Sequence, residues 1–249
     1  MKKLTLLGAA LMVTACGDQG NNTAATATSN APLEQVAAPN GGDWTQTVTQ
    51  TAEGGMLMGN PNARVRVVEY ASMTCPHCAD FAEQGVPPLV NNYVKSGQVA
   101  YEFRNFVTNP LDITMSLIAR CAGATPQFFQ LTEAMYGDQE NILNRFQAVP
   151  PAQLQSLQSL PPGQQFQQVA QLAGLQEWAA QRGLPSGRTS QCLSNQGEIE
   201  KLVGMNGEAV SQYQIPGTPS FVINGELVDI QPGTPTWQQV ETAIRNALG

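Results

Sequence analysis

The sequence predicts an α/β fold into which a large, all-helical domain is inserted. Three observations indicate it. The motif CPHC at Cys75–Cys78 stands between an apolar run rich in β-branched residues, 65–70, and a stretch of helix-forming residues. The residues from 110 to 213 then show helical spacing but no strand pattern. Strand signals return at 220, where Asn224-Gly225 predicts a tight hairpin turn ahead of a last amphipathic helix.

The first 16 residues are expected to be a lipoprotein signal. Lys2 and Lys3 form a positive start, an apolar stretch too short to span a bilayer follows, and VTAC at 13–16 resembles a lipoprotein cleavage motif. We therefore expect cleavage before Cys16 and lipid on its sulfur, which anchors the chain to the cell membrane. An ordinary secretory signal cut nearby is the alternative. Both readings predict export to the periplasm, where disulfides persist.

Net charge argues against some classes of partner. The chain has 12 basic and 19 acidic side chains. Without Lys2 and Lys3 the processed chain keeps 10 basic side chains, so its net charge is −9. A surface of this sign argues against binding to nucleic acid or to anionic lipid headgroups. Apolar residues make up 42% of the chain, which is enough for a sizeable core.

Residues 17–43 are expected to be a flexible tether. They are rich in Asn, Thr, Ala, Gln and Gly and show no apolar periodicity. We expect residues 44–109 and 214–249 to form the α/β domain and residues 110–213 to form the helical insertion. Because the tether offers no room for a dimerisation domain, we expect a monomer.

Apolar spacing predicts the elements of the α/β domain. Residues 64–71 form a nearly continuous apolar run, as a central, buried strand would. Pro87-Pro88 interrupts the helix that follows CPHC, and residues 99–107 form a second strand. A hairpin over 220–230 and a helix over 237–248 complete the domain.

The same spacing predicts the helices of the insertion. They cover 111–122, 126–135, 164–182 and 199–213. The Gln-rich stretch 147–181 is interpreted as a solvated helical hairpin without a function of its own.

The motif CPHC carries the chemistry that the sequence predicts. Cys75 should lie at or just before the first helical turn, with Pro76 at a position where a missing N–H costs nothing. Unpaired backbone N–H groups and the positive end of the helix dipole favour the thiolate, so the pKa of Cys75 should fall. His77, the only histidine, can donate a hydrogen bond to the same sulfur. Cys78, one turn on, is the expected resolving thiol.

Two other interpretations of CPHC compete with redox chemistry. A zinc site uses the same spacing but needs a second close pair of ligands, and the other cysteines are isolated at 16, 121 and 192. We therefore expect no metal. An inert structural disulfide is the second alternative, although cysteines this close on one helix are rarely used that way.

The remaining cysteines predict a structural disulfide. The chain has five cysteines. When Cys16 and the redox pair are set aside, Cys121 and Cys192 remain, and an even remainder in an exported protein indicates a bridge.

Three further residues, in two segments, are expected at the site. Glu69 stands in an otherwise apolar strand six residues before Cys75, so its carboxyl group should be buried and its pKa raised, which would let it take a proton from Cys78. A solvent-facing position at the strand edge is the alternative. Thr218-Pro219, just before the hairpin, is interpreted as a cis-proline loop whose backbone pairs with an extended substrate peptide; a plain turn is the alternative.

Apart from the helical block, the order of elements is that of a thioredoxin fold. Three segments also resemble the DsbA family of periplasmic thiol:disulfide oxidoreductases. EYASMTCPHC at 69–78 is similar to the family's strand and active site, RGLPSGRTSQCL at 182–193 to the end of its helical insertion, and IPGTPSFVING at 215–225 to its cis-proline loop. Thioredoxins typically carry CGPC instead, and glutaredoxins CPYC. The lipoprotein motif is a departure from the soluble members.

The resemblance implies a reaction and its partners. A thiolate of a reduced client protein attacks the disulfide at Cys75, and a second client thiolate then displaces Cys75. A low pKa of Cys75 makes the oxidised form a strong oxidant. The redox-active disulfide is the only prosthetic chemistry implied, reduced exported proteins are the substrates, and a quinone-linked membrane oxidase would regenerate the disulfide.

The leading hypothesis is therefore a disulfide-forming oxidase, and three alternatives remain. A reductase or isomerase can use the same fold, but the dimeric isomerases have a separate N-terminal domain, for which 27 tether residues leave no room. A non-catalytic binding or chaperone lipoprotein would not need CPHC with a Thr-Pro loop. A copper-delivery protein is the third alternative, but those on related folds use CxxxC and a distant histidine, whereas His77 is the only histidine of this chain.

Overall fold

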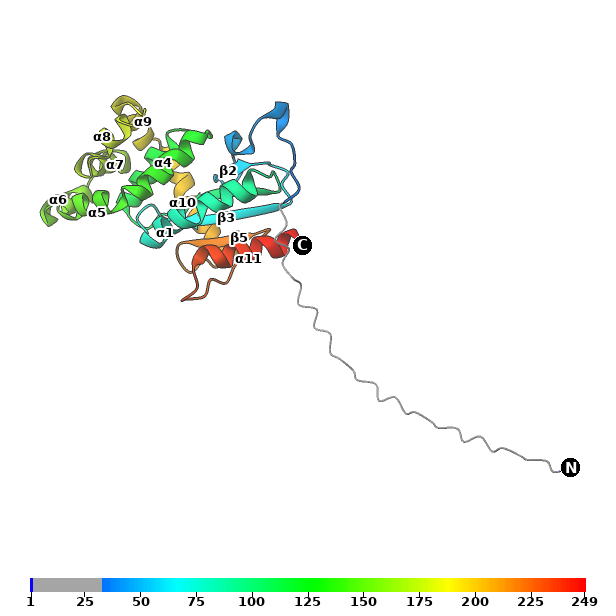
Figure 1. The fold of residues 1–249 in the computed structure, drawn as a ribbon. Coiled ribbons are helices and arrows are strands. Elements are labelled where there is room, and N and C mark those ends of the chain that lie inside the picture. The colour runs from blue at the N-terminus through cyan, green and yellow to red at the C-terminus, as the bar shows by residue number, and fades with distance from the viewer. Residues whose placement is uncertain (2–32) are drawn as a thin grey trace. The chain divides into compact units, whose positions relative to one another are not determined.

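The computed structural model of the protein describes Met1 and residues 33–249 (Figure 1). The expected lipid attachment at Cys16, the rest of the expected signal and residues 17–32 of the expected tether lie outside the described residues.

A six-stranded mixed sheet organises the α/β part. Its strands are β1 (Val48–Gln50), β2 (Met56–Gly59), β3 (Val65–Ala71), β4 (Val99–Asn105), β5 (Ser220–Ile223) and β6 (Glu226–Leu227). Their order across the sheet is β1-β2-β4-β3-β5-β6. β3 pairs parallel with β4 and antiparallel with β5, so the strand that leads into CPHC has a neighbour on both sides. This position explains its nearly continuous apolar sequence, because both faces of a central strand are covered.

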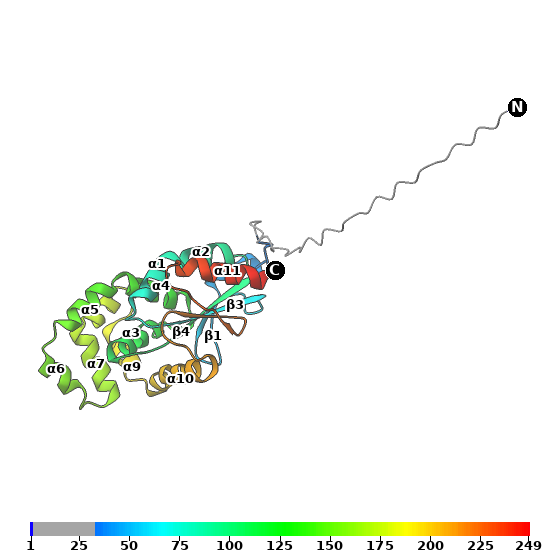
Figure 2. The same cartoon turned by 90° about the horizontal axis from the view of Figure 1, so that it is seen from below.

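Helices cover both faces of the sheet. Figure 2 shows α1 (Pro76–Gln84), α2 (Val86–Pro88) and α11 (Thr236–Leu248) on one side and α10 (Gln196–Tyr213) on the other. Alternation along β3 sends Val65, Val67, Glu69 and Ala71 toward one face and Val68 and Tyr70 toward the other. The apolar members of the first set belong to the large core that contains residues of α1 and α11, and the second set packs with Ala209 of α10 and with Ile215. Glu69 therefore lies on the same face as the CPHC helix.

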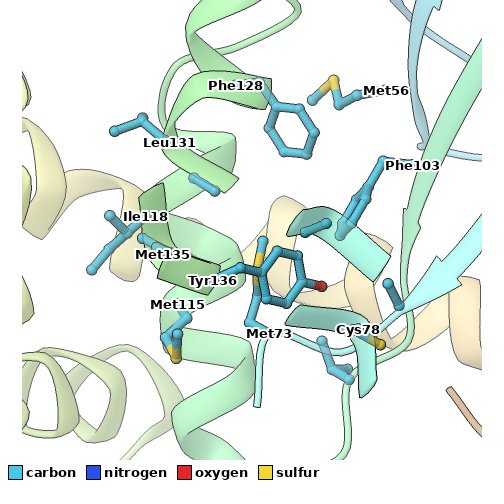
Figure 3. Packing of buried hydrophobic residues seen from close by; sticks show 14 of the residues in the cluster. Met56, Met73, Cys78, Phe103, Met115, Ile118, Phe128, Leu131, Met135 and Tyr136 are labelled. Atoms are coloured by element: carbon cyan, nitrogen blue, oxygen red, sulfur yellow. The ribbon is translucent and has the colours of Figure 1, made fainter. Parts of the chain in front are cut away.

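Residues 110–213, all of which the structure describes, contain helices and connecting loops only. The helices before α10 are α3 (Pro110–Arg120), α4 (Pro126–Gly137), α5 (Gln139–Gln147), α6 (Pro151–Leu157), α7 (Pro162–Leu172), α8 (Leu175–Ala180) and α9 (Ser186–Leu193). The core runs without interruption from this block into the sheet, where Phe103 of β4 packs against Phe128 and Tyr136 of α4 (Figure 3). The fold is thus a thioredoxin fold with a helical insertion, as predicted.

Several elements differ from the prediction. The expected helix over 164–182 is two helices, because Gly174 adopts a left-handed conformation (φ 70°) that ends α7. The helix after CPHC already breaks at Gly85, and a π-helical segment, Leu89–Val94, follows α2. The short strands β1 and β2 and the helix α5 were not predicted, whereas α6 lies within the stretch 147–181 that was interpreted as a helical hairpin. β1 has three residues, and β2 is buried at all four positions, so neither shows a clear alternation.

The expected tether is wrong at its C-terminal end. The backbone N–H of Val36 donates to the Ser96 carbonyl (2.8 Å), and Trp44 Nε1 donates to the Val36 carbonyl (2.7 Å). Because Trp44 is buried, the backbone at Val36 is held against the α/β domain, although the composition of this stretch resembles that of a linker.

Candidate active site

The CPHC motif lies where β3 passes into α1, as the sequence predicts. Cys75 is the N-cap of α1, in an extended conformation (φ −86°, ψ 120°), and Pro76 is the first helical residue. The Cys75 carbonyl accepts from the backbone N–H groups of Cys78 and Ala79 (both 3.2 Å), which starts the helix. The Cys75 sulfur is half-buried, and it faces the unpaired N–H groups of the first turn.

The pKa of Cys75 is lowered from its ordinary value of 9.0 to about 5. The largest cause is a hydrogen bond from the Cys78 side chain, and the Thr218 side chain and the backbone N–H groups of Cys78 and His77 lower the pKa further. Partial burial opposes these effects. As a thiol, Cys75 donates to the Thr218 carbonyl (3.2 Å), a contact that the thiolate cannot make. Donors from the helix start therefore outweigh the one acceptor that favours the thiol.

Cys78, in contrast to Cys75, is fully buried and its pKa is raised. Its side chain has no exposed surface and lies at the edge of the core near Met73 and Tyr136 (Figure 3). Burial raises its pKa most, and the hydrogen bond to Cys75 and the negative charge of Glu69 raise it further. The two sulfurs thus differ strongly in acidity, and of the two only Cys75 is exposed to a substrate.

Glu69 is buried, with 1% of its surface exposed, so the strand-edge alternative is wrong. Burial raises its pKa to about 8, and the negative charge of Cys75 adds to that effect. The hydroxyl of Tyr101 on β4 donates to the Glu69 carboxyl group and partly offsets the shift. Both side chains line a cavity of about 310 Å³ beside α1 and α4. An acid at this position is largely protonated at neutral pH and can exchange a proton with a neighbouring sulfur.

The Thr218–Pro219 peptide bond is cis. The loop that contains it connects α10 to β5 and carries the Thr218 carbonyl to the Cys75 sulfur. This loop and residues 227–230 line a groove of about 500 Å³. Two of the sequence-predicted site residues, 143 positions apart, thus come into contact.

The prediction of a hydrogen bond from the His77 imidazole to the Cys75 sulfur is wrong. The His77 side chain is 80% exposed, and its Nδ1 lies 3.4 Å from Oδ2 of Asp80, one turn further along α1. The backbone N–H of His77, rather than its ring, acts on the pKa of Cys75. The ring points outward because this face of the first turn is exposed and Asp80 offers an acceptor there.

Two buried residues of the insertion hold the active-site loop, and sequence reasoning missed both. Asp112 of α3 accepts from the Met73 N–H (2.8 Å) and from the Ser72 hydroxyl (2.6 Å). Nε2 of Gln139, on α5, donates to the carbonyls of Met73 (2.9 Å) and Cys75 (3.0 Å). The sequence offers a local indication only for Asp112, which follows Asn109 and Pro110 at the start of a predicted helix. No local pattern around Gln139 indicates a contact with the active-site loop.

Cys75 and Cys78 are free thiols in this structure, whereas a disulfide joins Cys121 at the end of α3 to Cys192 of α9, with 5.7 Å between their Cα atoms. Among the described residues, no three His, Cys, Asp or Glu side chains are grouped so that they could hold a metal ion. No helix in the described part of the chain combines the length and hydropathy needed to cross a membrane.

Comparisons with known sequences agree with this geometry. The family model described as Thioredoxin matches residues 51–246. Curated relatives named "Putative protein-disulfide oxidoreductase" come from Rickettsia felis, with 27% identity over 195 residues, and from Rickettsia conorii, with 28% over 197. Each match covers 78% of this chain and 60% of the relative, so the chain spans somewhat less than two thirds of these relatives.

Solved structures with a similar fold also include proteins named for disulfide chemistry. The crystal structure of a protein-disulfide isomerase from Novosphingobium aromaticivorans is 34% identical, with a TM-score of 0.70, and the match covers 78% of this chain and 96% of that one. Wolbachia pipientis alpha-DsbA1, 22% identical with a TM-score of 0.59 over 78% and 90% of the two chains, has the same fold. Together with the N-cap Cys75, the buried Cys78 and the family match over most of the chain, these similarities show that this protein belongs to the thioredoxin family.

Proposed function

We propose that the protein is an exported thiol:disulfide oxidase that donates the Cys75–Cys78 disulfide to reduced client proteins. The observation that carries this proposal is the difference between the two sulfurs. Cys75 is half-exposed with a pKa of about 5, whereas Cys78 is buried with a raised pKa. A stable Cys75 thiolate favours the reduced form of the pair, and a pair that prefers to be reduced is a strong oxidant toward client thiols.

The reaction transfers two electrons from the client to the protein. A client thiolate attacks Cys75 Sγ, a new S–S bond forms, and the Cys75–Cys78 bond breaks. Cys78 leaves as a thiolate and, because its pKa is raised, takes a proton; the protonated Glu69 carboxyl group is the proposed donor. A second client thiolate then attacks the client sulfur and releases Cys75 as a thiolate. The client gains a disulfide and the protein becomes a dithiol.

Backbone pairing at the Thr218 loop supports protein substrates. The Thr218 carbonyl lies 3.2 Å from the Cys75 sulfur, so a client held on Cys75 can pair its backbone with this loop, in the manner of an added strand. The sequence pattern at residues 2–16 supports export and a lipid anchor at Cys16. A quinone-linked membrane oxidase is the proposed reoxidant.

A disulfide isomerase or reductase is the second candidate, and the name of the 34% identical Novosphingobium structure favours it. The reduction potential distinguishes the two. An oxidase should equilibrate with glutathione near the value of about −120 mV known for DsbA, and a reductase near about −270 mV, as thioredoxin does.

The test is equilibration of the purified protein with glutathione, combined with oxidative refolding of a reduced, multi-disulfide client. We expect a potential close to the oxidising value and stoichiometric transfer of one disulfide per protein. A thioredoxin-like potential, or repair of scrambled disulfides without net oxidation, would move the assignment to the second candidate.

A further inference from the structure

A groove on the helical insertion begins next to the nucleophile. Residues of α3, α5, α6 and α7 enclose a volume of about 350 Å³, and Thr74, the residue before Cys75, forms part of its wall. Asn109 Nδ2 donates to the Thr74 hydroxyl (2.9 Å), so the wall is continuous from the insertion to the active-site loop. The volume is at the lower end of the range for ligand pockets, about 300 to 1,000 Å³.

The lining of this α5–α6 groove is apolar and carries no charge. Leu143 and Phe146 of α5 and Leu154 of α6 line it, and each is only half-buried. Its polar members are uncharged, among them Gln147, Gln158 and Gln165. An extended polypeptide with apolar side chains matches this surface, because the amide side chains can hydrogen-bond its backbone without selecting for charge.

The Gln-rich stretch 147–181, which had no assigned role, supplies α6 and α7 of this groove. It contains 11 glutamines and one charged residue, Glu177. The stretch therefore adds almost no charge to the groove, although the chain as a whole has a net charge of −7. This composition suits a surface that accepts many client sequences.

We propose that the α5–α6 groove binds an uncharged, apolar segment of the client polypeptide that flanks the reacting cysteine. The inference rests on the proposed function, and it adds a second contact to the one at the Thr218 loop. A client joined to Cys75 in the mixed disulfide has its neighbouring residues beside Thr74, where the groove starts. The groove thereby selects clients whose apolar residues are still exposed, as in a newly exported, unfolded chain.

The test is the rate of thiol–disulfide exchange of Leu154→Gln with two reduced cysteine peptides. One peptide carries leucine and phenylalanine near its cysteine, and the other carries serine at those positions. We expect a loss of about tenfold in kcat/KM for the apolar peptide, typical of a lost apolar contact in a binding pocket, and no change for the serine peptide or for glutathione. Leu172→Gln is the matched control, because Leu172 is a half-buried leucine of α7 outside the groove lining.

The outcomes separate this proposal from the proposed function. If the wild type oxidises neither the peptides nor glutathione, the proposed function fails. If exchange is normal but Leu154→Gln treats both peptides as the wild type does, the groove proposal is overturned. A change in sedimentation of Leu154→Gln without a change in peptide rates would mean that a second copy of the chain covers the groove, and this also overturns the proposal.

A second measurement leaves the groove unmodified. Each peptide is joined to Cys75 in the Cys78→Ser variant, and amide hydrogen exchange is followed over 139–157. The apolar peptide should slow exchange there by severalfold, whereas the serine peptide should not. Equal protection by both peptides, or protection by neither, would contradict the proposal even if Leu154→Gln fails to fold.

Discussion

Replacing Glu69 by glutamine is expected to remove a pH-dependent cost to folding. Glu69 is buried beneath the CPHC helix, and its pKa is about 8 in the folded protein against an ordinary value of 4.5. The folded state therefore keeps this carboxyl group protonated at pH 7, whereas the unfolded chain ionises it. Each pH unit between the two pKa values destabilises the folded state by about 1.4 kcal/mol.

The sign and size follow from linkage. Because the folded pKa is raised, the contribution of Glu69 to stability is fully present below pH 4.5 and is lost as the pH rises toward 8. By pH 7 the loss is about 3 kcal/mol, which is a large fraction of the stability of an ordinary domain. Glutamine has no such titration, so Glu69→Gln should gain about 3 kcal/mol relative to the wild type between pH 4.5 and pH 7.

Urea unfolding of both proteins across this pH range measures the difference. The oxidised form is the correct sample, because Cys75 and Cys78 do not titrate as a disulfide. The negative charge of Cys75, the smallest of the causes that shift the pKa of Glu69, is absent in this form, so the shift there rests on burial, which is the largest cause. The change of the difference with pH is more informative than its absolute value, since the glutamine amide also needs buried hydrogen-bond partners. Glu140→Gln, which removes an exposed carboxylate, is the control. Parallel curves for wild type and Glu69→Gln would refute the assignment of Glu69 as a buried, protonated acid.

Three further predictions concern the cysteines. Cys75→Ser should abolish client oxidation, whereas Cys78→Ser should accumulate mixed disulfides on non-reducing gels; equal trapping by both variants would contradict Cys75 as the attacked sulfur. Removing the Cys121–Cys192 bridge by double serine substitution should lower the free energy of unfolding by up to about 4 kcal/mol, because the bridge closes a long loop, with a sequence separation of 71. An unchanged urea midpoint would contradict a stabilising role of this bridge. Because the pKa of Cys75 is lowered in the folded protein, the thiolate contributes its full stabilisation above pH 9, and this contribution is lost as the pH falls through about 5. The reduced form should therefore gain stability relative to the oxidised form from pH 5 to pH 9 in urea unfolding. A pH-independent difference between the two forms would mean that Cys75 is not a stabilised thiolate.

Much of the site could be predicted from the sequence because its signals are local. The apolar run before CPHC predicted a central strand, and Pro76 predicted the start of a helix, which together place Cys75 at an N-cap. Asn224 and Gly225 both have positive φ, as the hairpin turn requires. These predictions depend on dihedral preferences and burial patterns within a few residues, so they need no knowledge of the tertiary structure.

Contacts between distant segments could not be predicted in this way. The sequence placed Glu69 in a buried strand, but its partner, Tyr101, lies on the neighbouring strand and meets it only through the register of β3 and β4. Asp112 and Gln139 reach the loop before Cys75 because the insertion packs against it, and no local pattern records that packing. The direction of the His77 ring likewise depended on the exposed acceptor at Asp80.

The sequence by itself therefore determined the reactive motif, the elements beside it and the pairing that remained for Cys121 and Cys192. Only the tertiary structure decided which side chains surround the two sulfurs, where the Gln-rich stretch packs and that a groove runs from it to Thr74. The physical reason is that local spacing fixes the conformation of a segment and which of its faces is buried. Acidity and binding depend instead on charges, donors and surfaces that distant segments bring to the same place.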